Sequence, residues 1–330
     1  MFLKKSNAIV LSDCLGIQKL VAGSPERQLT TILYHQFFFG EENRDIARDR
    51  LKRQCEWLVD SYSPVTATQA VNSLGRNDLS GYSLLVTIDD AKLQVLDVLD
   101  IFESFEIPLV LFVCPGWSDR GNPIDESTAL MRAVATLHWY DGPAVTIESG
   151  GLSVQIETGM NTKVIDKVLE AAENDAQFSA VELAESLDRV MPGSVRQVCN
   201  WSEITDLASR GVEIGSHAVS HVRLAEQSDR RLRYEISESK KALSAKIGTC
   251  AHFAYPYGDP GTFDERTVEA LRQSGYSDGF ITRVGFANGS IDPCELPRIT
   301  MPEAVMGQAE FRARVRGGGI PFSVIKKFVS

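Results

Sequence analysis

Three short segments of this sequence carry side chains that could hydrolyse a bond with the help of a metal ion. Asp89 and Asp90 follow an apolar run, and His217 and His221 stand four positions apart. One carboxylate and two imidazoles form a ligand set that divalent transition metals accept, with coordination positions left open. The other carboxylate can then serve as the base for a water molecule at the metal. The sequence therefore suggests metal-assisted hydrolysis.

Each of these side chains also has an ordinary structural interpretation. Asp89 and Asp90 can cap the next helix, and on an extended backbone they point to opposite sides, which suits a division of roles. His217 and His221 face the same way if their segment is helical and can then share a metal, or they are two ordinary polar surface histidines at the start of a helix. His35, at the end of the first strand, can protonate a leaving group or can be a structural core residue.

The third segment is an aromatic loop that contains proline and glycine, Phe253–Gly258. The fixed proline and the flexible glycine could hold a backbone N–H toward an oxyanion, although a plain turn has the same composition. Aromatic side chains near such a site can stack on a sugar or belong to the core. The candidates are Trp117, Trp139, Trp201, Tyr255 and Tyr257.

Apolar strand patterns alternate with amphipathic helix patterns along the chain. Strands are predicted over Thr30–His35, Leu84–Ile88, Leu109–Val113, Gly211–Gly215, Ala251–Tyr255 and Gly279–Thr282. Helices are predicted over Asn43–Asp60, Trp201–Arg210, Asp229–Ile247 and Thr262–Ser274, and Leu93, Leu96, Leu99 and Phe102 share one further helical face. This alternation predicts an α/β fold of parallel βα units, for which a barrel is the expected form. In such a barrel the strand ends carry the chemistry.

An insertion interrupts this alternation from residue 117 to residue 198. It is expected to contain a hairpin over Ala144–Glu157, turning at Ser149-Gly150-Gly151, and two helices over Thr162–Glu173 and Ala180–Val190. No serine- or proline-rich linker flanks it. We therefore interpret residues 1–330 as a single barrel domain with a hairpin-plus-helices insertion.

Composition excludes some classes of function. The net charge of −10 argues against a general nucleic-acid binder, and 330 residues that are 43% hydrophobic suffice for a large core. The six cysteines show no CxxC spacing, which favours free thiols in a reducing compartment. Asp13 interrupts the short apolar run near the amino terminus, so no secretory signal is expected. We expect a cytoplasmic protein.

The last 20 residues, Phe311–Ser330, combine basic and apolar side chains and contain no acidic residue. The basic residues are Arg312, Arg314, Arg316, Lys326 and Lys327. Such a tail can dock on an anionic membrane or on a pyrophosphate-linked substrate. Its short length favours a tail that packs under the barrel, and membrane association is left open.

The three segments in this order resemble the polysaccharide deacetylase family, also called the NodB-homology or carbohydrate esterase 4 family. Thr87-Ile88-Asp89-Asp90-Ala91 is similar to its Thr-Phe-Asp-Asp-Gly motif, with Ala91 in place of glycine. His217-Ala218-Val219-Ser220-His221 is similar to its two-histidine motif, and Phe253–Gly258 to its Arg-x-Pro-Tyr motif with Ala254 in place of arginine. The resemblance runs from about Thr31 to Met301, less the insertion. It implies a distorted (β/α)7 barrel.

The resemblance also implies roles. It makes Asp89 the catalytic base, and it makes Asp90, His217 and His221 the ligands of a divalent metal, usually Zn²⁺. The backbone N–H of Tyr257 would stabilise the oxyanion. The implied substrate is an N-acetylated sugar of a polysaccharide, a glycan, or a lipid-linked or nucleotide-linked precursor.

Two departures from the family pattern bear on the general acid. No histidine follows His252, whereas the last motif of the family carries one. The exopolysaccharide-type branch instead has a Tyr-His on the first strand, which Tyr34-His35 matches, so the resemblance makes His35 the acid. Arg298, in the stretch that corresponds to the last motif, is expected to lower the pKa of Asp89 through its charge.

Two other classes of function stay open. One is a different amide or ester hydrolase on the same metal site, which removes formyl or O-acetyl groups or opens a cyclic amide. The other is a glycan-binding module without catalysis. The missing arginine at Ala254 and the missing late histidine favour that module, whereas the complete Asp90, His217 and His221 set argues against it.

Overall fold

A computed structural model describes residues 28–79, 81–118, 126–140, 142–149, 152–157, 161–190 and 198–317. The chain divides into two compact units. Unit 1 consists of Met1–Leu111, Gly211–Glu213 and Ser277–Ser330, and unit 2 consists of Phe112–Arg210 and Ile214–Tyr276.

The main sheet of the described chain has eight strands. They are β1 (Gln28–Tyr34), β2 (Ser63–Pro64), β3 (Tyr82–Ile88), β4 (Leu109–Val113), β7 (Glu213–Ser216), β8 (His252–Ala254), β9 (Asp278–Phe280) and β10 (Ile299–Thr300). Their order is β10-β1-β3-β4-β7-β8-β9, and β2 pairs with β3. The pairs of β1 with β10 and β3, of β3 with β2 and β4, and of β7 with β8 are all parallel. The predicted α/β class of parallel βα units is confirmed.

The strands of unit 1 explain where its candidate residues lie. β1, β3 and β4 are buried along almost their whole length, because a parallel sheet covered on both faces needs continuous apolar runs. Tyr34 of β1 lies opposite Ile88 of β3. The next residues, His35 and Asp89, therefore follow the carboxyl ends of two neighbouring strands.

The described residues of unit 1 form the helices α3 (Arg44–Ser61), α4 (Ala67–Arg76), α5 (Leu99–Ser104) and α13 (Gln308–Val315), and the 3₁₀ turns η1 (Leu93–Val95) and η3 (Pro293–Glu295). Helix α3 begins where predicted, because the side chain of Asn43 accepts the backbone N–H groups of Asp45 and Ile46. Helix α4 and strand β10 were not predicted.

The predicted helical face of Leu93, Leu96, Leu99 and Phe102 is wrong. Residues 93–95 form a 3₁₀ turn, α5 begins only at Leu99, and Leu96 is 36% exposed. The polar side chain of Gln94 accounts for the break, because it accepts the backbone N–H groups of Phe37 and Phe38 and ties the turn to the loop after β1.

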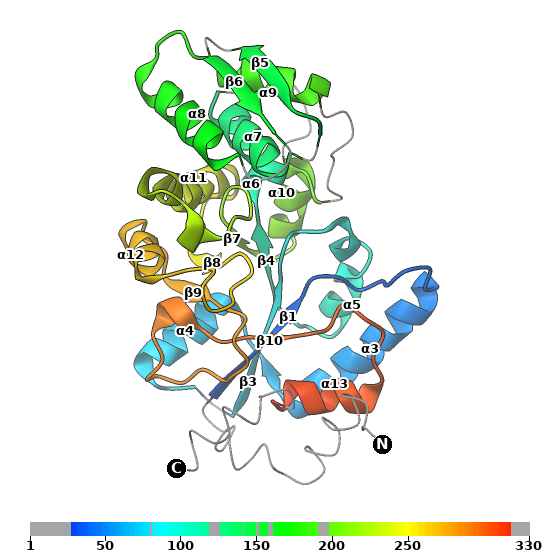
Figure 1. Cartoon of the computed structure of the whole chain (residues 1–330). Coiled ribbons are helices and arrows are strands. Elements are labelled where there is room, and N and C mark those ends of the chain that lie inside the picture. The colour runs from blue at the N-terminus through cyan, green and yellow to red at the C-terminus, as the bar shows by residue number, and fades with distance from the viewer. Residues whose placement is uncertain are drawn as a thin grey trace, which may run out of the picture. The chain divides into compact units, whose positions relative to one another are not determined.

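The described part of the C-terminal tail packs on unit 1. Helix α13 lies beside α3 (Figure 1), where the fully buried Phe311 meets the ring of Trp57. The guanidinium carbons of Arg312 and Arg316 lie 5.5 and 5.4 Å from the Trp57 centroid. Residues 318–330, with Lys326 and Lys327, lie outside the described residues. Among the helices described, none has the length and apolar character to cross a membrane.

Unit 2 contains the insertion. Its helices are α6 (Pro115–Ser118), α7 (Glu126–His138), α8 (Thr162–Asn174), α9 (Ala180–Val190), α10 (Trp201–Ser209), α11 (Asp229–Ile247) and α12 (Glu265–Gln273), with the 3₁₀ turn η2 (Leu224–Glu226). The predicted hairpin is present as β5 (Val145–Ser149) and β6 (Leu152–Ile156). The two predicted helices of the insertion are α8 and α9, whereas α7 was not predicted.

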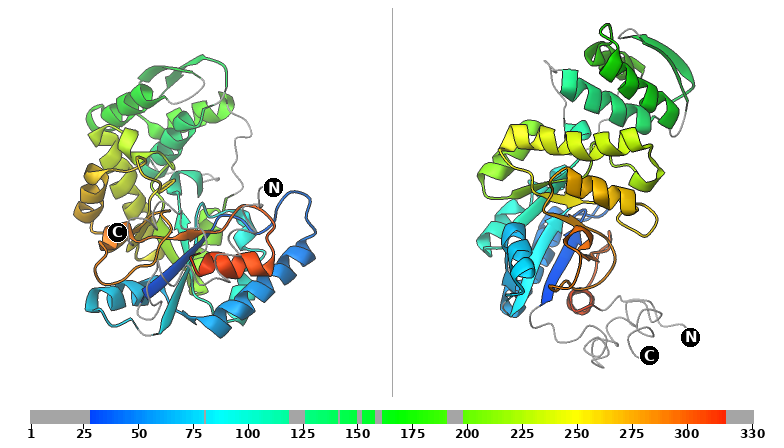
Figure 2. Two further views of the ribbon diagram at one scale, coloured as in Figure 1. Left: turned by 60° about the horizontal axis from the view of Figure 1, so that its bottom comes forward. Right: turned by 90° about the vertical axis from the view of Figure 1, so that its left-hand side faces the viewer.

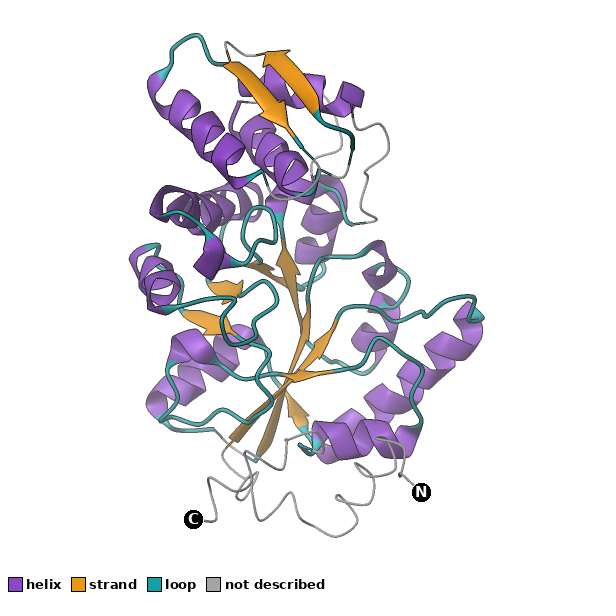
Figure 3. Ribbon diagram, in the orientation of Figure 1, coloured by secondary structure: helices purple, strands orange, loops and turns teal. Residues whose placement is uncertain are grey.

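The insertion has an apolar core of its own. Helices α7, α8 and α9 and one face of the hairpin contribute to it, and Figures 2 and 3 show the hairpin packed against these helices. Ile147, Val154 and Ile156 point into this core, whereas Thr146 and Gln155 are exposed, as the two-residue period of a strand requires. The inserted residues therefore form a packed layer within unit 2.

The cysteines in the described chain are free thiols. They are Cys55, Cys114, Cys199, Cys250 and Cys294, all buried, and Cys14 lies outside the described residues. Burial raises the pKa of the Cys55 thiol to about 12. These thiols serve as small apolar core groups.

Candidate functional site

Asp89 and Arg298 form a buried ion pair in unit 1. Arg298 Nη1 lies 2.7 Å from Asp89 Oδ1 and Nη2 lies 2.8 Å from Oδ2, and both side chains are almost fully buried. The planar guanidinium matches both oxygens at once and favours the charged carboxylate. Arg298 is itself oriented by the carbonyl of Ile281 and the hydroxyl of Thr87.

The neighbouring carboxylate of Asp90 has different surroundings. Its side chain is 14% exposed, and Oδ2 lies 3.6 Å from the ammonium of Lys92. Asp90 and Ala91 turn the chain through left-handed backbone, with φ of 69° and 49°. The family motif has glycine at position 91, and alanine adopts this conformation only at a cost. The two adjacent carboxylates thus lie in two environments, but the predicted extended backbone is not present at Asp90, and the left-handed turn separates them instead.

His35 lies among charged groups of unit 1. Its side chain is 22% exposed, and Nδ1 lies 3.9 Å from Oε1 of Glu303, which follows β10. Lys92 Nζ lies 4.0 Å from the same oxygen, and Gln36 donates a hydrogen bond to the other carboxylate oxygen.

In unit 2, His217 directly follows β7 and is 1% exposed. Its backbone N–H donates to the carbonyl of Val113, and its ring Nδ1 lies 2.7 Å from the carbonyl oxygen of Ala254. A carbonyl only accepts, so Nδ1 carries the hydrogen and the lone pair is on Nε2. A hydrogen bond from the ring nitrogen that does not bind the metal usually fixes the orientation of a metal-binding histidine.

The segment from His217 to His221 is a turn and not a helix, so the helical condition for a shared face is not met. Ala218 and His221 instead adopt left-handed φ angles of 61° and 56°. This turn brings the centroids of the two imidazoles to 4.8 Å, with the ring planes at 71°. The closeness of the rings therefore comes from the turn.

Tyr257 occupies the centre of another tight turn of unit 2. The backbone N–H of Gly258 donates to the carbonyl of Pro256 at 2.7 Å, and φ of Tyr257 is 63°. A three-residue turn with positive φ at a non-glycine residue is strained, and such strain is concentrated at functional sites. The Tyr257 ring lies 4.8 Å from the His221 ring.

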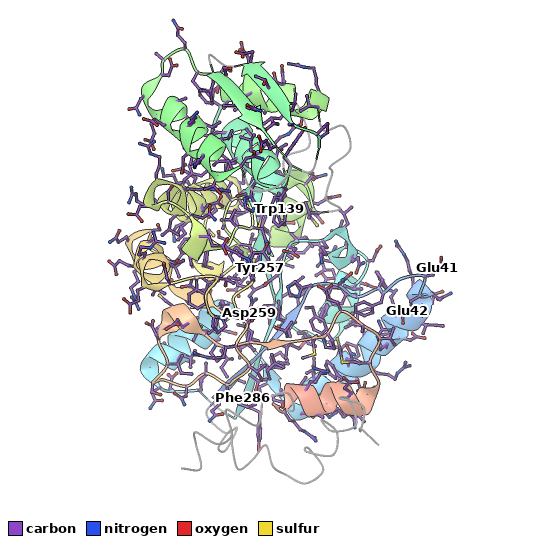
Figure 4. The ribbon with its side chains drawn as sticks, viewed as in Figure 1. Glu41, Glu42, Trp139, Tyr257, Asp259 and Phe286 are labelled. Atoms are coloured by element: carbon purple, nitrogen blue, oxygen red, sulfur yellow. The ribbon has the colours of Figure 1, made fainter. Side chains whose placement is uncertain are left out.

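Aromatic rings surround His221 in unit 2. Trp117 stacks on the imidazole at 5.3 Å between centroids, and Trp139 lies at 6.4 Å. Trp139 and Tyr257, labelled in Figure 4, are both half-buried, and Arg223 lies over the Tyr257 ring at 4.9 Å. Of the five aromatic candidates, Trp117, Trp139 and Tyr257 lie around His221. Trp201 instead starts α10, and Tyr255 stacks on Phe263.

Strained backbone is concentrated in the three motifs. In the described part of the chain, seven residues other than glycine have positive φ, and five of them are Asp90, Ala91, Ala218, His221 and Tyr257. Such conformations cost roughly 1–3 kcal/mol each and persist only where surrounding structure fixes them. Strained backbone of this kind is common at functional sites.

The donor set fits a divalent metal ion. The hydrogen bond to Ala254 prepares the Nε2 lone pair of His217, the ring of His221 lies next to it, and carboxylate is the usual third ligand type in such sites. Two nitrogens and one oxygen form a ligand set that divalent transition metals accept, with coordination positions left open.

Sequence reasoning missed Glu303 and Glu235, two carboxylates close to the candidate residues. Glu235 is fully buried in α11 and accepts hydrogen bonds from Ser220. A signal for it exists, because the buried Leu232 and Ile236 mark the inner face of α11 and Glu235 precedes Ile236. Nothing in the sequence marks Glu303.

Comparison with known proteins identifies relatives of the fold. The family model described as polysaccharide deacetylase matches residues 76–278. The structure of the deacetylase PplD of Streptococcus pyogenes in complex with acetate is 14% identical, covers 83% of this chain and 92% of that chain, and has a TM-score of 0.55. IcaB from Ammonifex degensii is 19% identical, with 88% and 97% covered and a TM-score of 0.54.

A de-N-acetylase from Aggregatibacter actinomycetemcomitans is also similar, at 15% identity, with 87% of this chain and 99% of that chain covered and a TM-score of 0.53. A search of curated protein sequences found no significant match. The structural likenesses confirm the predicted fold, a distorted (β/α)7 barrel of the deacetylase type.

Proposed function

The chain belongs to the polysaccharide deacetylase family, and from this premise we propose that it is a metal-dependent hydrolase that removes N-acetyl groups from a sugar. The sugar belongs to a polysaccharide, a glycan, or a lipid-linked or nucleotide-linked precursor. The observation that carries the proposal is the pair of imidazoles 4.8 Å apart, with His217 held in the tautomer that binds metals.

The proposed metal ligands are Asp90, His217 and His221. The family motifs support this assignment, because Asp90, His217 and His221 stand at the positions that match the metal ligands of the family. A bound Zn²⁺ would polarise the acetyl carbonyl and make a water molecule more acidic. Two nitrogen ligands and one oxygen ligand leave room for both groups.

Asp89 is the proposed general base. Its position beside the proposed ligand Asp90 places this carboxylate where it can take the proton from the attacking water. Arg298 holds the carboxylate in one orientation through two hydrogen bonds. The absence of arginine at position 254 favoured a binding module. Arg298 nevertheless supplies a guanidinium to Asp89, and this pairing supports an enzyme.

Tyr257 and His35 complete the proposed reaction. The backbone N–H of Tyr257, held in a tight turn, stabilises the negative charge that develops on the carbonyl oxygen. His35 then donates a proton to the amine as the carbon–nitrogen bond breaks. Both roles follow the residues that the family motifs match.

Acetate release tests the proposal directly. We expect the purified protein to release acetate from at least one member of a panel of oligomeric, nucleotide-linked and lipid-linked N-acetyl sugars. Treatment with a chelator should abolish the release, and added Zn²⁺ should restore it, since the ion activates both reactants. Release of formate, or of acetate from O-acetyl sugars with none from any N-acetyl sugar, would indicate another hydrolase. Bound metal without turnover of any substrate would indicate a binding module.

His35→Gln should separate amide from ester substrates. An amine leaves only with a proton, so we expect kcat on the N-acetyl sugar to fall by about 10²-fold. 4-Nitrophenyl acetate releases a stable anion that needs no proton, so its hydrolysis should be nearly unchanged. Steady-state kinetics on both substrates measure the difference. An equal loss on both substrates would show that His35 is not the acid.

A further inference from the structure

Ser220, the residue before the proposed ligand His221, is fully buried and is bonded from two sides. Its backbone N–H donates to Oε2 of Glu235 at 2.9 Å, and its hydroxyl donates to Oε1 at 2.5 Å. Its carbonyl accepts the indole N–H of Trp139 at 2.8 Å. All of these groups belong to unit 2. The backbone next to His221 is thus fixed by α11 and by the insertion.

Glu235 is a fully buried carboxylate, and its counter-charge is buried as well. Arg231, one helical turn earlier in α11, places Nε 3.5 Å from Oε1 of Glu235, and neither side chain is exposed. Burial lowers the pKa of Arg231, and the charge of Glu235 acts in the opposite direction. Two apolar side chains of similar volume would pack at least as well. Packing alone therefore does not explain this pair.

The turn that Glu235 supports is strained. Ala218 and His221 have positive φ, so the chain keeps this conformation only where contacts fix it. The turn is also packed tightly against Gly116 and Cys114. Gly116 donates its N–H to the carbonyl of Val219, and a Cβ at Gly116 would lie 2.7 Å from that oxygen. Cys114 Sγ lies 2.9 Å from the carbonyl oxygen of His217.

We propose that Glu235 is a positioning residue for the metal-binding turn. By accepting both hydrogen bonds of Ser220, it fixes the left-handed backbone at His221 and aims that imidazole at the ion that His217 binds. Arg231 supplies the counter-charge beside this carboxylate inside the protein. The inference rests on the proposed function, and it adds a residue that contacts neither the ion nor the substrate.

Zn²⁺ affinity, measured by competition with a chromophoric chelator, tests this role. Glu235→Gln keeps the shape of the side chain. Its single acceptor oxygen can accept only one of the two hydrogen bonds that Ser220 donates. We expect the affinity to fall about 10–100-fold, the usual range for partners of metal ligands. Glu238→Gln is the matched control on the same helix, because Glu238 pairs with Lys241 at the surface. The Zn²⁺ affinity of Glu238→Gln should equal that of the wild type.

A double variant separates positioning from stability. Glu235→Gln leaves Arg231 without a counter-charge and should lower the urea midpoint. Arg231→Met with Glu235→Met removes both charges and should recover the midpoint. Ser220 still lacks its acceptor, so we expect low Zn²⁺ affinity and an altered visible spectrum of the Co²⁺ form. Recovery of affinity together with stability would overturn the proposal.

The outcomes also distinguish this inference from the proposed function. If the wild type binds Zn²⁺ and Glu235→Gln binds it equally well, Glu235 has no positioning role and the metal site stands. If the wild type binds no divalent ion, the metal site itself is wrong, and the inference is wrong with it.

Discussion

Asp89→Asn is expected to lower kcat on an N-acetyl sugar by at least about 10²-fold, the usual scale for a general base. Asparagine keeps the shape of the side chain, but its amide cannot take a proton from water at neutral pH. Steady-state acetate release at saturating substrate measures the effect. The metal content should stay at the wild-type value, because the proposed ligands are other residues.

Asp90→Asn is the matched comparison for Asp89→Asn. The two positions are adjacent, and the two carboxylates have different partners, Lys92 for Asp90 and Arg298 for Asp89. We expect Asp90→Asn to lose bound Zn²⁺ and activity together, whereas Asp89→Asn loses only activity. Full activity of Asp89→Asn on the true substrate would exclude it as the base. Undiminished metal in Asp90→Asn would exclude that residue as a ligand.

Arg298→Met should lower the free energy of unfolding by about 3–5 kcal/mol, the range for breaking a buried ion pair from one side. The substitution leaves the Asp89 carboxylate buried with no positive charge on its oxygens. Urea denaturation followed by circular dichroism measures the change. Activity should fall as well, because the base loses the groups that orient it.

Arg266→Met is the control for this prediction. Arg266 also makes ion pairs, to Asp229 and Asp264, but its side chain is 45% exposed and solvent screens the interaction. Exposed pairs contribute about 0–1 kcal/mol. A second comparison is Arg298→Met combined with Asp89→Asn, which removes both charges and should recover much of the lost stability. A loss for Arg298→Met no greater than that of Arg266→Met would show that the buried pair does not stabilise the fold.

The sequence predicts the parts of this structure that depend on local pattern. Continuous apolar runs identified β3 and β4, and helix α11 has the bounds that its pattern predicted. The side chains that follow β1 and β3 could be predicted to lie side by side, because parallel strands end at the same edge. The interaction of Arg298 with Asp89 was also expected, because Arg298 lies in the stretch that corresponds to the last motif of the family. No local sequence pattern indicated it.

The rest depends on tertiary contacts that no local pattern encodes. The turn at Ala218 and His221 is left-handed because Glu235 and Trp139 hold Ser220, and both come from distant segments. The interrupted helix at Leu93–Phe102 follows from the contact of Gln94 with the loop after β1. In both places a long-range hydrogen bond determines the backbone, and spacing along the chain gives no sign of it.

The ion pair between Asp89 and Arg298 also has a consequence for synthesis on the ribosome. The two residues are 209 positions apart, and the pairing of β1 with β10 joins the first and last strands of the main sheet. At translation rates of about 5–20 residues per second, the carboxylate is made roughly 10–40 s before its arginine. During this interval the apolar strand β1 lacks the partner at its other edge. A nascent chain released before Arg298 would contain Asp89 and the turn from His217 to His221. It would lack the guanidinium that holds the Asp89 carboxylate in place.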